Sequence, residues 1–359
     1  MSAKTNENKT SEPKRRGKGR WLLLLFASIF AAVLTVFGFA RAVADRAREV
    51  MRASGYVEEW TEGVDGETVE SIAYGDEEWQ KLDAYFPKEL AAEKSRGALV
   101  YVHGGAWVGG KRGDMRGFAR RATKAGYVSA SVEYLLFKRG ENESRYSIFA
   151  VLDELDAALA KLKETASERG IELDRVALAG DSAGGHIISL YAYSRGKSAP
   201  LPVVFIAPRV APIDFHVDAW DPVQPPRSVE LLVRFMNRDH RETPLELIKK
   251  PDAETEKLIN GISPLAHLTP ESAIPTVSAY GGKDPLVGTK HCAKLAQKFA
   301  ELGAKPLAEV APEDETSIVF DLVEHPNSGH MLEKDPERAE RFRELTFEYA
   351  RRYLEEPAR

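Results

Sequence analysis

The pentapeptide G-D-S-A-G at residues 180–184 constrains the fold of this chain more than any other feature. It follows the apolar run 175–179 directly, and an apolar segment over 186–193 follows it. This order predicts a buried strand, a sharp turn and a helix, with a serine at the turn. Glycines on both sides suit a turn too tight for side chains, and the helix N-terminus behind the serine favours negative charge.

Apolar runs and amphipathic segments alternate along residues 65–359. We expect paired edge strands within 67–87, and further strands at 98–103, 127–134, 175–179, 203–208, 274–280 and 317–323. Helices are predicted at 148–168, 183–195, 288–303 and 335–354. Strands separated by helices indicate an α/β fold with a mostly parallel central sheet and helices on both faces. Ligands of such sheets bind at the carboxyl ends of the strands.

Residues 209–262 interrupt this alternation. The segment is rich in proline at its start, and helix-like patches follow near 229–236 and 245–248. It comes after the strand 203–208, at the end of the sheet where ligands bind. We therefore expect a cap-like insertion over the pocket, the alternative being a surface excursion without function.

The N-terminus predicts a membrane anchor. Residues 1–20 carry seven basic and two acidic side chains, which indicates a cytoplasmic basic tail. Residues 21–40 contain no charge and are long enough for a transmembrane signal-anchor helix of about 30 Å. Residues 41–64 read as a linker. Residues 65–359 would lie on the extracytoplasmic side, and the alternative is secretion after signal cleavage near the A-V-A at 42–44.

Charge and cysteine content exclude several classes of protein. The net charge is −5, and the basic tail leaves the remaining residues at −10, which argues against nucleic-acid binding. The single cysteine, Cys292, allows neither an internal disulfide nor a thiolate metal cluster, and its helical spacing with Leu295 and Phe299 predicts core packing.

Three residues form a candidate catalytic set in the order Ser182, Asp284, His330. A serine hydroxyl needs a base to become a nucleophile, and His330 lies in a loop just after a predicted strand. An imidazole takes and returns protons near neutral pH. Asp284 follows a Gly-Gly turn after the strand 274–280 and would orient the ring.

A second glycine-rich loop, H-G-G-A-W at 103–107, follows the apolar strand 98–102. Backbone N–H groups of Gly104, Gly105 and Ala106, with that of Ala183, would stabilise the oxyanion of a tetrahedral intermediate. His103 is expected to fix the turn, and His186 to pack against its own helix.

Other residues compete for these roles. His325 is an alternative base, although the proline after it favours a structural role. Alternative acids are Asp214, Asp314 and Asp321. The remaining histidines show no metal-ligand spacing, and we expect neither a metal nor a cofactor; these histidines are His216, His240, His267 and His291.

Over about residues 65–355 the chain resembles the hormone-sensitive-lipase-type carboxylesterases of the α/β-hydrolase superfamily. The resemblance is carried by H-G-G-A-W at 103–107, G-D-S-A-G-G at 180–185 and the pair Asp284 and His330, with D-P-L at 284–286 as a smaller mark. It implies an α/β-hydrolase fold and cofactor-free hydrolysis of carboxylic esters through an acyl-enzyme. The chain departs from the family after strand 127–134, where Y-L-L-F-K replaces the common Y-R-L-A-P, and Ala106 replaces a third glycine.

The leading hypothesis is an esterase acting on small-molecule esters with short acyl groups. An amidase or peptidase would use the same three residues. A binding domain of hydrolase type would have no need of a nucleophile, base and acid together. The sequence gives no oligomeric state.

Overall fold

The computed structural model describes residues 55–94, 96–142, 145–237 and 243–355. The predicted tail 1–20 and membrane span 21–40, with most of the predicted linker, lie outside these ranges, so they stay predictions. Within the described ranges, no helix combines the length and hydropathy needed to cross a membrane.

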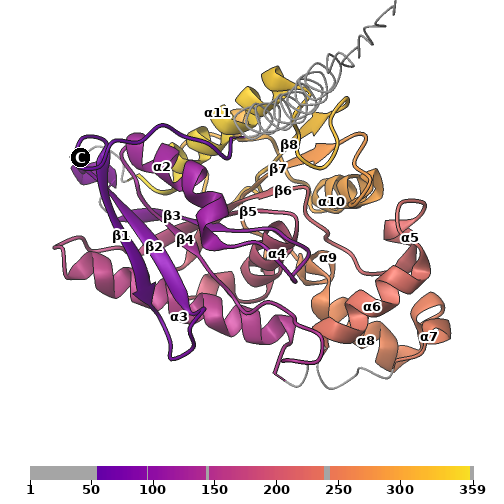
Figure 1. Cartoon of the computed structure of the whole chain (residues 1–359). Coiled ribbons are helices and arrows are strands. Elements are labelled where there is room, and N and C mark those ends of the chain that lie inside the picture. Colours follow the sequence, from indigo (N-terminus) through magenta and orange to yellow (C-terminus); the bar gives the residue numbers. More distant parts are fainter. Residues whose placement is uncertain (1–54, 95, 143–144, 238–242, 356–359) are drawn as a thin grey trace, which may run out of the picture. The chain divides into compact units, whose positions relative to one another are not determined.

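An eight-stranded sheet runs through the centre of the fold in the order β1-β2-β4-β3-β5-β6-β7-β8 (Figure 1). Its strands are β1 (Gly66–Ala73), β2 (Lys81–Pro87), β3 (Gly97–Val102), β4 (Val128–Val132), β5 (Arg175–Asp181), β6 (Val203–Arg209), β7 (Thr276–Gly281) and β8 (Phe320–His325). Pairs β1–β2 and β2–β4 are antiparallel, and all the other pairs are parallel. The mostly parallel sheet agrees with the sequence prediction.

Helices cover both faces of the sheet. Among the described residues outside the 210–262 segment, the helices are α2 (Arg116–Lys124), α3 (Ile148–Ser167), α4 (Ala183–Arg195), α9 (Pro264–His267), α10 (Thr289–Glu301) and α11 (Pro336–Tyr353). Short 3-10 turns lie at η1 (Ala92–Lys94), η2 (Arg112–Met115), η3 (Gly196–Ser198) and η5 (Leu307–Glu309).

The alternation of side chains along β3 shows why both faces are apolar. Val100 and Val102 belong to the core on the side of α3, α4 and α10. Leu99 and Tyr101 belong to the core on the side of α2 and α11. A parallel strand buried on both faces carries such an uninterrupted apolar run. Cys292 is buried in the first core, as predicted, and burial raises the pKa of its thiol to about 12.

The segment after β6 is helical. It contains α5 (Val217–Trp220), α6 (Pro226–Met236), α7 (Leu245–Lys249) and α8 (Ala253–Ile262). The predicted helical patches correspond to α6 and α7. Since Arg209 is the last residue of β6, the inserted segment starts at Val210 and not at 209.

Other boundaries also differ from the predictions. β8 begins at Phe320 rather than 317, because Val319 makes only an isolated bridge with Lys305. Helix α2 was not predicted.

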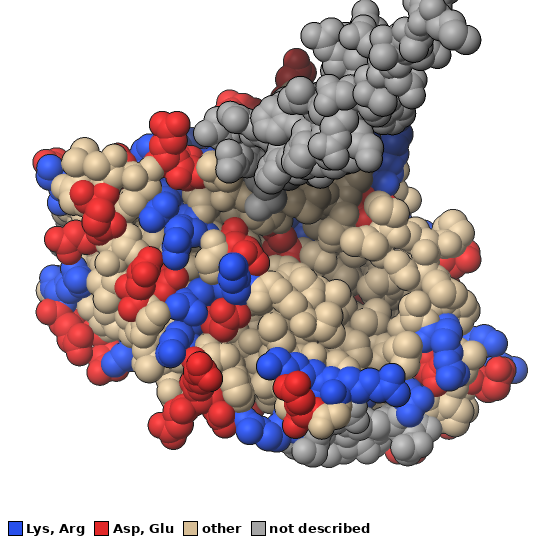
Figure 2. Space-filling view, in the orientation of Figure 1, with Lys and Arg blue, Asp and Glu red and all other residues tan. Residues whose placement is uncertain are grey.

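The face shown in Figure 2 mixes acidic and basic side chains around a central area of uncharged residues.

Candidate active site

Ser182 occupies the junction between β5 and α4. Its backbone has φ +54° and ψ −117°, and it is the residue just before the first turn of α4. Such a conformation costs a non-glycine residue about 1–3 kcal/mol and persists only where the surroundings enforce it. The turn therefore holds the serine at the N-terminus of the helix, as the sequence predicts.

Close backbone contacts explain the flanking glycines. A Cβ on Gly180 would lie 2.9 Å from the Val102 carbonyl oxygen, and one on Gly184 only 2.1 Å from the same atom. A Cβ on Gly104 would lie 3.3 Å from the Ser182 Cβ. The turn thus packs directly on the end of β3 and on the loop after it.

His330 and Asp284 come together from two loops. His330 Nδ1 lies 2.7 Å from Asp284 Oδ2, and the Asp284 side chain is fully buried. The other carboxylate oxygen accepts the backbone N–H groups of Leu286 (2.8 Å) and Val287 (3.0 Å). Because Nδ1 faces this carboxylate, Nε2 is the ring nitrogen left for another partner.

Backbone packing also joins these two loops. A Cβ on Gly281 would lie 2.3 Å from the Gly329 carbonyl oxygen, so the turn before Asp284 tolerates no side chain there. Among the described residues, neither the Ser182 hydroxyl nor His330 Nε2 forms a hydrogen bond. Hydrogen bonds of this type often form fully only once a substrate is bound.

The loop after β3 has an unusual backbone. Gly105, Ala106 and Trp107 have φ values of +114°, +52° and +62°. The Gly105 carbonyl oxygen accepts the N–H groups of Val108 (3.1 Å) and Gly109 (2.9 Å), which closes a turn. Gly105 and Ala106 are exposed, whereas Ala183 is buried at the start of α4.

His103 lies beneath this loop and is fully buried. Its Nδ1 donates to the Gly104 carbonyl oxygen (2.7 Å), and its Nε2 lies 2.9 Å from Glu133 Oε1. Glu133 also accepts the Arg112 backbone N–H (3.2 Å). Both ring nitrogens are thus engaged in holding the loop, the role expected from the sequence. The Gly104 carbonyl shares its peptide unit with the Gly105 N–H.

Sequence reasoning missed Glu133, although its position directly after a buried strand was a usable signal. It also missed a contact of His186, whose Nδ1 accepts the Trp107 indole N–H (3.2 Å). Nε2 of the same ring donates to the Ile262 carbonyl oxygen (2.8 Å), and burial lowers the pKa of His186 to about 4. The neutral ring therefore links the loop after β3 to the end of α8.

The alternative base and acids make other contacts. His325 is fully buried at the end of β8, and neither ring nitrogen has a partner within the described residues. Asp314 accepts hydrogen bonds from its own loop, including the Ser317 hydroxyl. Asp321 accepts the Tyr349 hydroxyl at 2.9 Å. Asp214 belongs to a separate network.

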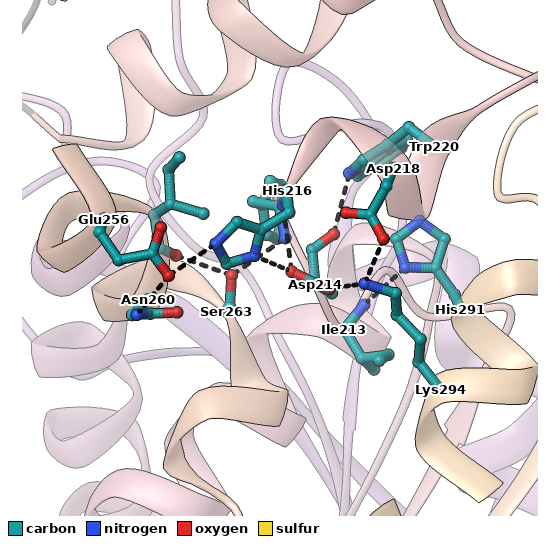
Figure 3. Close-up of polar contacts among 12 residues, drawn as sticks. Ile213, Asp214, His216, Asp218, Trp220, Glu256, Asn260, Ser263, His291 and Lys294 are labelled. Atoms are coloured by element: carbon teal, nitrogen blue, oxygen red, sulfur yellow. Dashed lines mark hydrogen bonds and ion pairs between the residues drawn. The ribbon is translucent and has the colours of Figure 1, made fainter. Parts of the chain in front are cut away.

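Figure 3 shows this network at the joint between the 210–262 segment and the rest of the fold. Asp214 contacts His216 Nδ1 (2.6 Å) and Lys294 Nζ (2.6 Å) with its two oxygens. His216 Nε2 lies 3.1 Å from Glu256 on α8. Burial favours a higher pKa for Asp214, but the hydrogen bonds from His216 and Lys294 outweigh it and hold the pKa well below its usual range. The hydrogen bond to Asp214 raises the pKa of His216.

Three kinds of comparison relate this chain to known proteins. The family model BD-FAE matches residues 82–299. The Oryza sativa subsp. japonica protein "Probable isoprenylcysteine alpha-carbonyl methylesterase ICME" is 27% identical over 168 residues, 47% of this chain and 35% of that protein. Esterase LipQ of Mycobacterium tuberculosis is 24% identical over 231 residues, 62% of this chain and 50% of LipQ. The chain thus spans half or less of these relatives' length.

Among solved structures, a truncated carbohydrate esterase from gut microbiota aligns with a TM-score of 0.59 at 16% identity. The alignment covers 81% of this chain and all of that structure. At this identity the likeness shows a shared fold, which is the α/β-hydrolase fold that the sequence predicts.

Proposed function

Because the chain belongs to the BD-FAE family, we propose that it is a serine carboxylesterase that cleaves small-molecule esters with short acyl groups. Ser182 is the nucleophile, His330 the general base and acid, and Asp284 the group that orients the imidazole. The names of the matched relatives and of the structural neighbour, all esterases or methylesterases, support an ester as the substrate.

The proposed reaction proceeds in two halves. Ser182 Oγ attacks the ester carbonyl carbon while His330 Nε2 takes its proton, and the same nitrogen then protonates the departing alcohol. Water repeats the sequence on the acyl-enzyme, releasing the carboxylic acid and restoring the serine. N–H groups of Gly104, Gly105, Ala106 and Ala183 are the candidate donors to the oxyanion, each worth about a hundred- to thousand-fold in turnover in related sites.

The hydrogen bond between His330 and Asp284 carries the proposal. It joins residues 46 positions apart, uses a fully buried carboxylate, and leaves Nε2 available for proton transfer. A binding domain would gain nothing from this arrangement, because recognition does not need an oriented general base.

The test is the variant Ser182→Ala, with Ser194→Ala on the same helix as its matched control. Ser182→Ala should lose nearly all hydrolysis of a short p-nitrophenyl ester and all labelling by a fluorophosphonate, because no other hydroxyl replaces the nucleophile. Ser194→Ala should keep both, because the Ser194 hydroxyl donates to the Leu190 and Tyr191 carbonyl oxygens within its own helix. Activity retained by Ser182→Ala would refute the assignment.

Comparing esters with anilides of the same acyl group separates an esterase from an amidase, and a series of acyl lengths tests the preference for short chains.

The proposed location, anchored by residues 21–40 with the body outside the cytoplasm, is tested by membrane fractionation of the full chain and of one lacking residues 1–40. If only the shortened chain is found in the soluble fraction, the result supports an anchor. If both chains are found there, the result supports a cleaved signal.

A further inference from the structure

Residues 55–62, here called the N-terminal arm, lie against α2 and outside the residues that the family model matches. The Tyr56 ring packs edge-on against Phe118, with 5.1 Å between ring centroids. Glu58 pairs with Arg121 (2.9 Å) and Lys124 (3.1 Å). The arm is thus fastened along the helix by both apolar and charged contacts.

Backbone contact fixes the position of the arm on α2. A Cβ on Gly117 would lie 2.2 Å from the Tyr56 carbonyl oxygen and 2.9 Å from the Val57 nitrogen. The glycine allows the arm to approach the first turn of α2 as closely as it does. The place of the Tyr56 side chain is therefore well determined.

The Tyr56 hydroxyl donates a hydrogen bond to Asp181 Oδ2. Asp181 precedes the proposed nucleophile, and its side chain is only 6% exposed. Its other oxygen lies 3.5 Å from Arg209 Nε. Burial, and next the Asp181 charge, raise the pKa of Tyr56 well above its usual value, so the phenol remains a donor.

Arg209 connects this carboxylate to the Ser182 backbone. The Ser182 N–H donates to the Arg209 carbonyl oxygen at 2.8 Å, while the Arg209 guanidinium faces Asp181. One residue of β6 therefore holds both the turn and the side chain that precedes it. Tyr56 completes this set from a part of the chain 125 residues earlier.

Two polar contacts orient the Asp181 carboxylate beside a cavity. The cavity, of about 70 Å³, lies on the α2 and α11 side of the sheet, and Asp181, Arg209 and Phe118 are among its lining residues. The two contacts are those to the Tyr56 hydroxyl and to Arg209 Nε.

We propose that Tyr56 is a positioning residue for the nucleophile: the N-terminal arm fixes Asp181 and thereby the strained turn that presents Ser182. This inference rests on the proposed function. Without the Tyr56 hydroxyl, Asp181 loses one of the two polar contacts described above, and any change in its position passes to the adjacent Ser182.

The experiment compares Tyr56→Phe with Glu58→Gln, an arm variant that loses charge pairs on α2 without touching Asp181. Tyr56→Phe should lower kcat and the rate of fluorophosphonate labelling about tenfold, with KM changed by less than about twofold. Glu58→Gln should keep the wild-type kcat. The melting temperature of each variant separates a positioning effect from partial unfolding.

A double-mutant cycle supplies the second readout. Asp181→Ala removes the acceptor of the same hydrogen bond, so Tyr56→Phe should cause little further loss in that background. A wild-type labelling rate in Tyr56→Phe, or a loss that appears only in the melting temperature, would overturn the positioning role. The role would also be overturned if the loss of labelling rate in the double variant equalled the product of the losses in the two single variants. A wild-type chain that is not labelled at Ser182 would overturn the proposed function and this inference together.

Discussion

The turn at Ser182 and the joint of the 210–262 segment are held by opposite means. At the turn, main chain meets main chain, and a Cβ on Gly180 or Gly184 would lie 2.9 Å or 2.1 Å from the Val102 carbonyl oxygen at the end of β3. At the joint, charged side chains from three segments meet, with Asp214 at the centre (Figure 3). The backbone packing at the turn is sensitive to added volume, whereas the network at the joint is sensitive to the protonation of its side chains.

Gly184→Ala should break the first arrangement and give the largest effect. The added Cβ would lie 2.1 Å from the Val102 carbonyl oxygen and 2.6 Å from that of His103, so the strand and the helix must separate. We expect a loss of about 3 kcal/mol or more in the free energy of unfolding, measured by urea denaturation, and ester hydrolysis below about 1% of wild type.

Gly113→Ala is the matched control, because a Cβ there meets nothing within 4 Å. It should leave both measurements close to wild type. A stable and active Gly184→Ala would show that backbone contact does not set the geometry of the turn.

Asp214→Ala should break the second arrangement with a smaller effect. It leaves Lys294 and His216 without the carboxylate that both contact, in a site where the Asp214 side chain is only 5% exposed. We expect a loss of about 2 kcal/mol in the free energy of unfolding, since the two partners remain partly solvated. Urea denaturation measures this loss.

The control is Asp153→Ala, which removes an ion pair to Arg195 from a side chain that is 72% exposed. Its cost should stay below about 0.5 kcal/mol. Equal effects of the two substitutions would contradict a special role for the network.

The same network should make stability depend on pH, which is the smallest of the three effects. The pKa of His216 is raised in the folded state, so its contribution is complete below about pH 6.5 and is lost as pH rises through the raised value. The pKa of Asp214 is lowered, so its contribution is present above about pH 3.9 and is lost as pH falls through the lowered value. The network is strongest between these limits.

His216→Asn should therefore reduce the free energy of unfolding more at pH 6 than at pH 9, by urea denaturation at both values. His267→Asn provides the comparison, because that ring contacts the Gly261 carbonyl oxygen and no carboxylate. If His216→Asn lowers the free energy of unfolding by the same amount at pH 6 and at pH 9, protonation of His216 does not contribute to stability.

Local patterns predicted the parts of the fold in which neighbours along the chain decide the structure. The apolar run of β3 and the strand, turn and helix around Ser182 follow directly from residue spacing. The sequence also contains a signal for the start of α8, since Asp252 accepts the Thr255 N–H as a helix cap. Proline and charged residues nearby made this signal hard to recognise. The start of β8 was placed three residues early because an apolar run does not show where pairing with β7 begins.

Contacts between distant segments could not be predicted in the same way. The sequence suggested Asp284 and His330 through their order and their loops, yet the hydrogen bond between them depends on how β7 and β8 lie side by side. Tyr56 and Glu133 gave no periodic signal at all, because their partners are set by packing across 125 and 30 residues.

The ring of His186 has a practical consequence for exchanging parts between relatives. It accepts from Trp107 with one nitrogen only while the other donates to the Ile262 carbonyl oxygen. A chimera that imports a foreign 210–262 segment must supply an acceptor at that point, or the imidazole loses the tautomer that receives the indole. Residues 107, 186 and 262 should therefore be exchanged together in such a chimera.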